Sequence, residues 1–275
     1  MVIDAHQHFW IYHPQKHSWI NDAMAVLKRD FLPAGLKAIY REHGIQGCVA
    51  VQAEQSEAET NFLLGLAEQN DFIKGVVGWV DFRADNIEER LQHFSRFEKL
   101  KGFRHIVQDE PDPNFLLRTD FQRGLSLLPQ YGYTYDILVY PTQLEAALRL
   151  VDRFPDHHFV LDHIAKPYIK TGQVGEWAEY IKAIAAHPQV FCKISGMVTE
   201  ADWGAWKAED FFPYLDVVFE AFGPDRLLFG SDWPVCLLAA DYGQVKSILE
   251  QYTESLSGWE KAGIWGGNAG AFYGL

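Results

Sequence analysis

The stretch VIDAHQHFW, from Val2 to Trp10, is a short apolar run that ends in two histidines, His6 and His8. Successive side chains of an extended strand point to opposite faces, so the imidazoles at positions i and i+2 lie on the same face. Two imidazoles at the end of a strand are suited to binding one divalent metal or one oxyanion. The pair is informative because a further histidine and an aspartate follow two much later apolar runs.

Similar apolar runs recur along the whole chain, at 48–51, 75–80, 102–107, 134–139, 158–161, 190–194 and 226–229. Helical periodicity fills the segments between them, within 62–67, 88–99, 144–154 and 177–186. Gly or Pro signals end several of these helices, at 131–132, 154–155, 187–188 and 222–224. Strict alternation of strand and helix implies parallel strands joined by crossovers. Eight such strands predict an α/β fold, a TIM-type (β/α)₈ barrel, in a single domain of residues 1–275.

An open, doubly wound sheet is the structural alternative. No glycine-rich phosphate loop follows the first apolar run, which disfavours that alternative. No linker or low-complexity tract divides the chain. Three irregular segments, 11–35, 109–114 and 199–212, follow predicted strands, and we expect them to lie over the mouth of the barrel. The last of them carries Trp203 and Trp206.

Composition narrows the class of protein. The chain has 275 residues, 48% of them hydrophobic, which is enough for a full barrel core. A formal net charge of −13 without a Lys/Arg block argues against binding to nucleic acid or to an anionic membrane surface. No apolar run approaches the roughly 18 residues of a transmembrane helix, and no signal-peptide pattern opens the chain. Cys48, Cys192 and Cys236 are odd in number and widely spaced, so we expect buried free thiols and a cytoplasmic location.

The ends of the predicted strands carry polar residues where an apolar continuation would be less costly. Active sites of (β/α)₈ barrels lie at the C-terminal ends of the strands, so these residues are expected to meet at one rim. The candidates are His6, His8, Glu54, Arg104, His105, His163, Lys166, Lys193 and Asp232.

Each candidate also has a structural explanation. The histidines are alternatively hydrogen-bonded core residues, and Asp232 is alternatively the cap of a following helix. The charged residues are alternatively members of an ion pair within the barrel or solvated charges, as for Arg104, Lys166 and Lys193. The functional hypothesis therefore requires His6, His8, His163 and Asp232 to surround one cavity.

Six motifs in the chain resemble the amidohydrolase superfamily. They are DAHQHFW (4–10), GFRHIVQ (102–108), LDHIAKP (161–167), KISG (193–196), LLFGSDWPV (227–235) and GGNAGAFYG (266–274). The chain is most similar to the sugar-lactonase branch, which includes L-fuconolactone and L-rhamnonolactone hydrolases and is related to pyrone-dicarboxylate lactonase. The resemblance spans essentially the whole chain, and it implies a distorted barrel that hydrolyses a cyclic ester. It places the His-x-His motif at His6 and His8, the later histidine at His163 and the last aspartate at Asp232.

The resemblance also bears on metal content. Many two-metal members use a bridging lysine or glutamate from a middle strand and a second late histidine. Here the fourth apolar run offers Arg104 and His105, and the fifth ends at Tyr140 without a histidine. The expectation is therefore one divalent metal at most, zinc being the predicted ion. Some relatives in this branch work without metal, so a metal-free site is the alternative.

Lactone hydrolysis needs an activated water and a polarised carbonyl. Asp232 is the predicted base, and zinc held by His6 and His8 would lower the pKa of water or polarise the carbonyl. Asp232, His163 or Glu54 would complete the metal shell. Without a metal, the three histidines would stabilise the oxyanion by hydrogen bonds. The predicted substrate-binding residues are Arg104, His105, Trp10, Trp233, Lys166 and Glu54.

Two other functions fit the same rim. One is decarboxylation or hydration of an unsaturated carboxylic acid, which needs a dense cationic pocket. Arg104, Lys166 and Lys193 are the available cations, and they form no cluster in the sequence. The other is a non-catalytic barrel that binds a sugar acid. The predicted partner is a small-molecule sugar lactone, and the sequence carries no signal for an oligomeric state.

Overall fold

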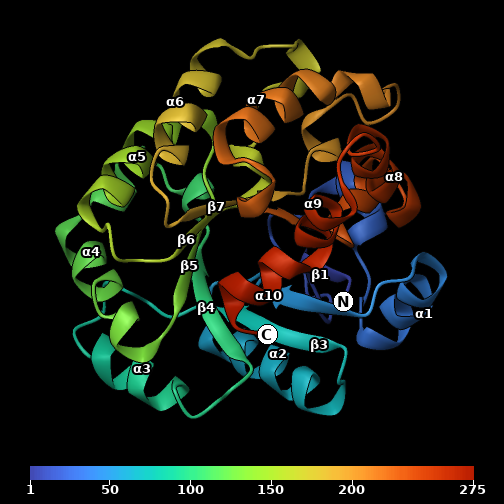
Figure 1. The fold of residues 1–275 in the computed structure, drawn as a ribbon. Helices are drawn as coiled ribbons and strands as arrows, with labels where there is room; N and C mark the ends of the chain where they lie inside the picture. Colours follow the sequence, from blue (N-terminus) through green and yellow to red (C-terminus); the bar gives the residue numbers. More distant parts are fainter.

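Eight parallel strands follow one another in chain order around a barrel in the computed structural model, which describes residues 1–275 (Figure 1). The strands are β1 Ile3–Gln7, β2 Gly47–Val51, β3 Ile73–Gly78, β4 Leu100–His105, β5 Thr134–Ile137, β6 Phe159–Leu161, β7 Val190–Ile194 and β8 Leu227–Phe229. Each strand pairs in parallel with the next. The predicted (β/α)₈ architecture is thus confirmed, with strand bounds shifted by at most two residues.

Most of the helices cover the outside of the barrel, and the last one lies across one end of it (Figure 1). They are α1 Pro33–His43, α2 Glu57–Gln69, α3 Ile87–Phe94, α4 Thr119–Leu125, α5 Leu144–Arg153, α6 Gly175–Ala185, α7 Phe212–Phe222, α8 Tyr242–Tyr252, α9 Gly258–Ala262 and α10 Asn268–Tyr273. The helix expected over 88–99 ends at Phe94, because the chain must turn before β4 begins at Leu100. No helix is both long and apolar enough to cross a bilayer.

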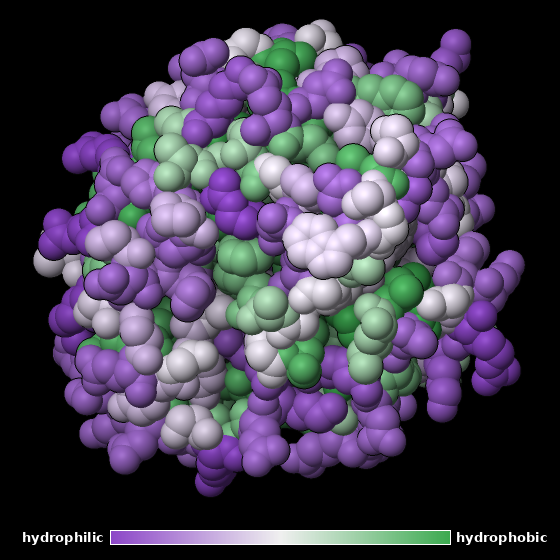
Figure 2. Space-filling view, in the orientation of Figure 1, coloured by the Kyte–Doolittle hydropathy of each residue, from purple (hydrophilic) through white to green (hydrophobic).

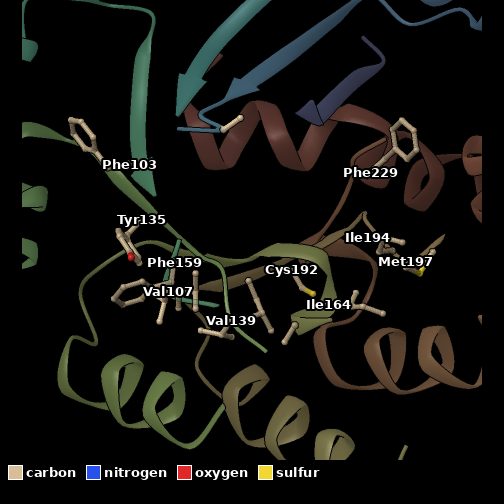
Figure 3. Close-up of a cluster of buried hydrophobic side chains, with 14 of the residues drawn as sticks. Phe103, Val107, Tyr135, Val139, Phe159, Ile164, Cys192, Ile194, Met197 and Phe229 are labelled. Atoms are coloured by element: carbon tan, nitrogen blue, oxygen red, sulfur yellow. The ribbon is translucent and has the colours of Figure 1, made fainter. Parts of the chain in front are cut away.

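The hydrophobic core has two parts. The larger cluster lies between the strands and the outer helices, and Figure 3 shows Phe103, Tyr135 and Phe159 within it. The smaller cluster fills one end of the barrel interior, where side chains of β1, β2 and β3 meet Phe272 and Tyr273 of α10. Helix α10 therefore closes that end of the barrel. Polar side chains cover most of the surrounding face, with apolar ones interspersed (Figure 2).

A bulge in β1 decides which of its side chains face the barrel interior. The pairing register between β1 and β2 shifts between Asp4 and Gln7. An extra residue in a strand reverses the alternation of faces beyond it. As a result Asp4 points outward to Tyr40 of α1, whereas His6 points inward to Lys193, although both are even-numbered.

The segment that follows β8 is hydrogen-bonded to β1 beside this bulge. The backbone N–H of Asp232 donates to His6 O at 2.8 Å, and the N–H of His8 donates to Trp233 O at 2.7 Å. The Asp4 carboxylate accepts hydrogen bonds from the Ser231 N–H and hydroxyl at 2.9 and 2.6 Å. It also accepts from the hydroxyls of two outer tyrosines, Tyr40 at 3.0 Å and Tyr242 at 3.1 Å. Asp4 thus fastens the chain segment that carries Asp232 to β1.

Asp4→Asn should lower the free energy of unfolding by about 3 kcal/mol. The side-chain NH2 group of asparagine would face the N–H and O–H groups that donate to the Asp4 carboxylate, so hydrogen bonds would be lost. Urea denaturation followed by circular dichroism measures the change. The control is Asp30→Asn, since the Asp30 carboxylate accepts from the N–H of Tyr12 in an exposed loop. That variant should change the free energy by less than about 1 kcal/mol. Equal losses in the two variants would contradict a fastening role for Asp4.

The three cysteines, Cys48, Cys192 and Cys236, are buried and free, as expected. Burial raises the pKa of each thiol, so none of them is an activated nucleophile. The cytoplasmic location remains a prediction from the sequence.

Candidate active site

A cavity of about 340 Å³ lies at the C-terminal ends of the strands. Its volume suits a small molecule rather than a polymer. The segments expected at the mouth supply much of its wall, including Trp19 and Met24 from 11–35, Asp109 from 109–114, and Trp203 from 199–212. Trp206 of the last segment instead donates its indole N–H to Ala239 O and does not line the cavity.

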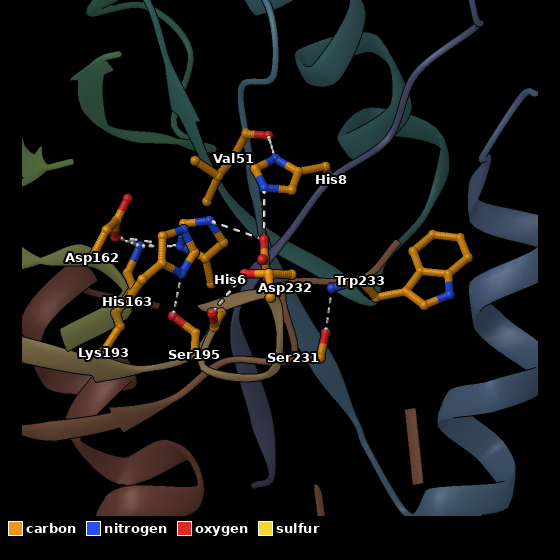
Figure 4. Close-up of polar contacts among 12 residues, drawn as sticks. His6, His8, Val51, Asp162, His163, Lys193, Ser195, Ser231, Asp232 and Trp233 are labelled. Carbon is orange, nitrogen blue, oxygen red and sulfur yellow. Dashed lines mark hydrogen bonds and ion pairs between the residues drawn. The ribbon is translucent and has the colours of Figure 1, made fainter. Parts of the chain in front are cut away.

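The histidines and the aspartate predicted to converge do lie together at the floor of this cavity (Figure 4). His8 Nε2 is 3.3 Å from Asp232 Oδ1, and His6 Nε2 is 3.9 Å from the same oxygen. The ring centroids of His6 and His163 are 4.3 Å apart. His8, His163 and Asp232 line the cavity, whereas His6 lies one layer deeper.

Asp232 is a buried carboxylate held in an uncommon backbone conformation. Its φ of 56° lies in the left-handed region, and its side chain is 4% exposed. Burial by itself would raise the pKa of Asp232, but His163 and His8 outweigh that effect and hold the pKa below its usual range. The 3-10 turn that follows, Val235–Leu238, has no side-chain cap. The capping explanation for Asp232 is therefore wrong, and its carboxylate faces the cavity in ionised form.

The hydrogen bonds of His8 leave a lone pair directed at Asp232. His8 Nδ1 lies 2.7 Å from Val51 O, and a carbonyl oxygen only accepts, so Nδ1 carries the hydrogen. In the neutral imidazole, Nε2 then presents a lone pair to Asp232 Oδ1, which is also an acceptor. Two acceptors 3.3 Å apart call for a cation between them or for a proton on one of them.

Two groups of buried side chains have ligand atoms close enough to hold one metal ion. The first is His6, His8 and Asp232, and the second is His6, Asp162 and His163. The atoms of each group lie within 4.8 Å of one another. Nitrogen and carboxylate donors of this kind suit Zn²⁺. In the first group Nε2 of His8 and Oδ1 of Asp232 face each other at 3.3 Å beside His6, so the residues present fit a divalent ion there.

A layer of buried charges supports this floor from below. Arg104 Nη1 donates to Asp162 Oδ2 at 3.0 Å, and Lys193 Nζ lies 3.0 Å from Asp162 Oδ1. Lys193 also pairs with Asp136, which accepts from the Tyr273 hydroxyl of α10 at 2.9 Å. Burial would raise the pKa of Asp162, but Lys193 and His6 outweigh it and hold that pKa well below its usual range. The positive charges of Arg104 and Lys193 balance the negative charges of Asp136 and Asp162. This layer therefore has no counter-ion left for the Asp232 carboxylate.

His163 is held by a left-handed turn that follows β6. His163, Ile164, Ala165 and Lys166 have φ of 55°, 47°, 57° and 49°. Each non-glycine residue in this region costs roughly 1–2 kcal/mol, a strain that often marks functional sites. His163 Nδ1 lies 2.9 Å from the Ser195 hydroxyl, and burial lowers the His163 pKa to about 3, so the ring is neutral.

A family model described as Amidohydrolase matches residues 3–275, which is nearly the whole chain. The chain belongs to the amidohydrolase family. It is 43% identical over 284 aligned residues to an L-fucono-1,5-lactonase of Burkholderia multivorans, covering 99% of this chain and 96% of that protein. It is 35% identical to an L-fucono-1,5-lactonase of Burkholderia ambifaria, with coverage of 98% and 94%. A crystal structure of a Burkholderia multivorans amidohydrolase with bound zinc superposes with a TM-score of 0.96 at 43% identity, covering 100% and 99% of the two chains.

Two of the predicted substrate-binding residues of this amidohydrolase line the cavity. Arg104 faces it from β4, and its Nη2 donates to the carbonyl of Gln52. Lys166 faces it from the turn after β6, and its Nζ is 3.0 Å from Glu200 Oε1. Lys193 is instead fully buried in the charged layer, so it is neither a solvated charge nor a lining residue.

His105 and Glu54 lie outside the cavity, which corrects their predicted contact with substrate. His105 follows Arg104 in β4, so it faces the outer helices by strand alternation. There its Nδ1 accepts from the Trp79 indole at 3.2 Å, and its Nε2 donates to Glu110 at 2.7 Å. Glu54 lies at a smaller neighbouring pocket, 3.5 Å from Lys16.

Trp10 and Trp233 are also outside the cavity, so neither provides a wall for a sugar. The Trp10 indole donates to Arg29 O at 2.9 Å and packs against Phe31 with ring centroids 5.3 Å apart. Trp233 packs against Phe31 at 5.2 Å, and Figure 4 shows its indole directed away from the histidines. Both rings hold the mouth segment 11–35 against the barrel.

Sequence reasoning missed several residues of the site. Asp136 and Asp162 hold the charged layer, and Tyr140, Thr199 and Glu200 line the cavity. Asp136 could have been identified from the sequence, since a carboxylate in the middle of an apolar run must be paired inside the protein. Glu200 could not have been identified in this way, because its partner Lys166 is 34 residues away in the chain.

Proposed function

We propose that this amidohydrolase hydrolyses a sugar-derived lactone, opening an aldonolactone to the sugar acid. The proposal depends above all on the ionised Asp232 carboxylate beside His8 and His163 at the floor of a small cavity. Full-length similarity to L-fucono-1,5-lactonases supports this reaction class. L-fuconolactone and L-rhamnonolactone are therefore the first substrates to test.

Asp232 is the proposed general base. Its carboxylate is ionised and buried, so it accepts a proton from the water molecule that attacks the lactone carbonyl. It then returns that proton to the ring oxygen as the bond between this oxygen and the carbonyl carbon breaks. His163 is neutral, and we propose that the Ser195 hydroxyl donates to its Nδ1, which places the ring hydrogen on Nε2. His163 then donates a hydrogen bond to the oxygen that becomes negative during attack. Arg104 and Lys166 are the proposed partners of the substrate oxygens, since both line the cavity.

His6, His8 and Asp232 are the proposed ligands of one zinc ion. A divalent ion there would supply Lewis-acid polarisation of the carbonyl and would balance the Asp232 charge. The Asp232 carboxylate has two oxygens, so ion binding and proton acceptance are compatible. His6 Nδ1 faces the charged layer, 3.1 Å from Lys193 Nζ and 3.3 Å from Asp162 Oδ1, and these two neighbours restrain the ring.

His8→Ala should reduce zinc affinity by about 100-fold, because it removes one of three proposed ligands and leaves the fold intact. Isothermal titration of the metal-stripped protein with zinc measures the affinity, and elemental analysis measures the content as purified. His105→Gln is the matched control, since this histidine also lies at a strand end, that of β4, but faces the outer helices. Unchanged zinc affinity in His8→Ala would exclude this ligand set.

A panel of aldonolactones in weakly buffered solution tests the reaction directly, because ring opening releases acid. We expect acid release from the fucono- or rhamnonolactone, with rates that depend on the configuration of single hydroxyls. A non-catalytic sugar-acid binder would show thermal stabilisation without acid release. A decarboxylase is less well supported, because both cavity cations are already neutralised, Arg104 by Asp162 and Lys166 by Glu200.

A further inference from the structure

The left-handed turn after β6 presents two of its four residues to the cavity. His163 and Lys166 line the cavity, and Ile164 and Ala165 between them are fully buried away from it. A conformation that L-residues adopt rarely, repeated over four positions, persists only where surrounding structure fixes it. What fixes this turn therefore also fixes the positions of His163 and Lys166.

Few contacts within the turn stabilise it. The N–H of Lys166 donates to His163 O at 2.8 Å, which closes the turn on itself. On one side the turn packs against Gly196, where a Cβ atom would lie 2.4 Å from His163 Nδ1. That close approach restrains the His163 ring but does not hold the backbone of the turn.

A side chain of α6 donates a hydrogen bond to the backbone in the middle of the turn. The Trp177 indole N–H donates to Ile164 O at 2.8 Å, and both residues are buried. The indole packs edge to face against Tyr214 of α7, with ring centroids 5.4 Å apart. Trp177 has no contact with the cavity, so its effect on the site acts through the turn.

We propose, on the basis of the lactone hydrolysis proposed above, that Trp177 is a positioning residue for the reaction. Its hydrogen bond to Ile164 O holds the turn in the left-handed conformation, which keeps His163 and Lys166 at the cavity. Loss of this bond displaces both groups without removing either of them. The expected defect is therefore in turnover more than in stability.

Trp177→Phe keeps an aromatic ring and removes the donor, and Trp206→Phe is the matched control. Trp206 also donates its indole N–H to a backbone carbonyl, Ala239 O at 2.9 Å, but not within the turn. We expect Trp177→Phe to lower kcat by about tenfold to 100-fold, because small displacements of reacting groups have effects of that size. KM should change by less than about threefold, and Trp206→Phe should keep kcat within about twofold of wild type. Both variants should lose a similar few degrees of Tm.

A readout independent of turnover separates this proposal from the proposed function. The ¹⁵N ring resonances of His163, assigned with His163→Gln, should shift in Trp177→Phe and stay in place in Trp206→Phe. If Trp177→Phe does not fold, benzothienylalanine at position 177 keeps the indole shape without the N–H and takes its place. Wild-type kcat together with unchanged His163 resonances would overturn the positioning role. Absence of lactonase activity in the wild type would overturn only the proposed function.

Discussion

Asp232→Asn should lower kcat for lactone hydrolysis by about 1,000-fold while the protein stays folded, since a general base contributes 10²–10⁴-fold to such reactions. The amide cannot accept the proton of the attacking water, and it removes the negative charge beside His8 and His163. Initial rates of acid release, measured alongside circular dichroism and Tm, test the expectation. The size of the variant side chain is unchanged, so a change in packing does not explain the loss.

Asp109→Asn is the control for this variant. Asp109 also lines the cavity, but it is exposed, and its side-chain hydrogen bond is with Gln108 and not with a histidine. Its amide variant should keep kcat within about threefold of wild type. Near-normal turnover by Asp232→Asn would remove Asp232 from the role of base and would leave the three histidines as the catalytic groups to test.

Lys193→Met should lower the free energy of unfolding by about 3–5 kcal/mol, the range found when one partner of a buried ion pair is removed. Lys193 is fully buried between Asp136 and Asp162, so its removal leaves two carboxylates with a single cation, Arg104. Methionine has a similar length and an apolar tip, so the loss of volume is small. Urea denaturation measures the free energy.

Lys166→Met is the matched control, because this lysine also pairs with one carboxylate but has a side chain that is 13% exposed at the cavity. We expect a loss of about 1 kcal/mol for it, as water solvates the remaining Glu200. The double variant Lys193→Met/Asp136→Asn should recover part of the loss, because it restores the balance of charge. Equal losses in the two lysine variants would contradict a buried counter-ion role for Lys193.

The barrel could be predicted from the sequence because alternation is a local signal. The apolar runs are short, several are preceded by Gly or Pro, and helical spacing follows four of them, and these features place strands to within two residues. The convergence of His6, His163 and Asp232 followed from the barrel rule alone, since all three stand at strand ends. No contact between them had to be known in advance.

Whether an individual side chain points into the barrel or toward the outer helices was harder to predict. His105 and Trp10 neighbour site residues in the chain, yet they point outward, because alternation separates His105 from Arg104 and a loop buries Trp10. The bulge in β1 was invisible in the sequence, and it alone explains why Asp4 and His6 face opposite ways. Glu200 approaches Lys166 only through the packing of two loops.

The closure of the barrel end by α10 has a consequence for synthesis. Tyr273 reaches Asp136 in the middle of the chain, and Phe272 packs with residues of β1. While residues near 273 are still inside the ribosome, the nascent barrel has an open end, and Asp136 lacks one of its donors. Completion of the interior must therefore wait until translation has passed this helix.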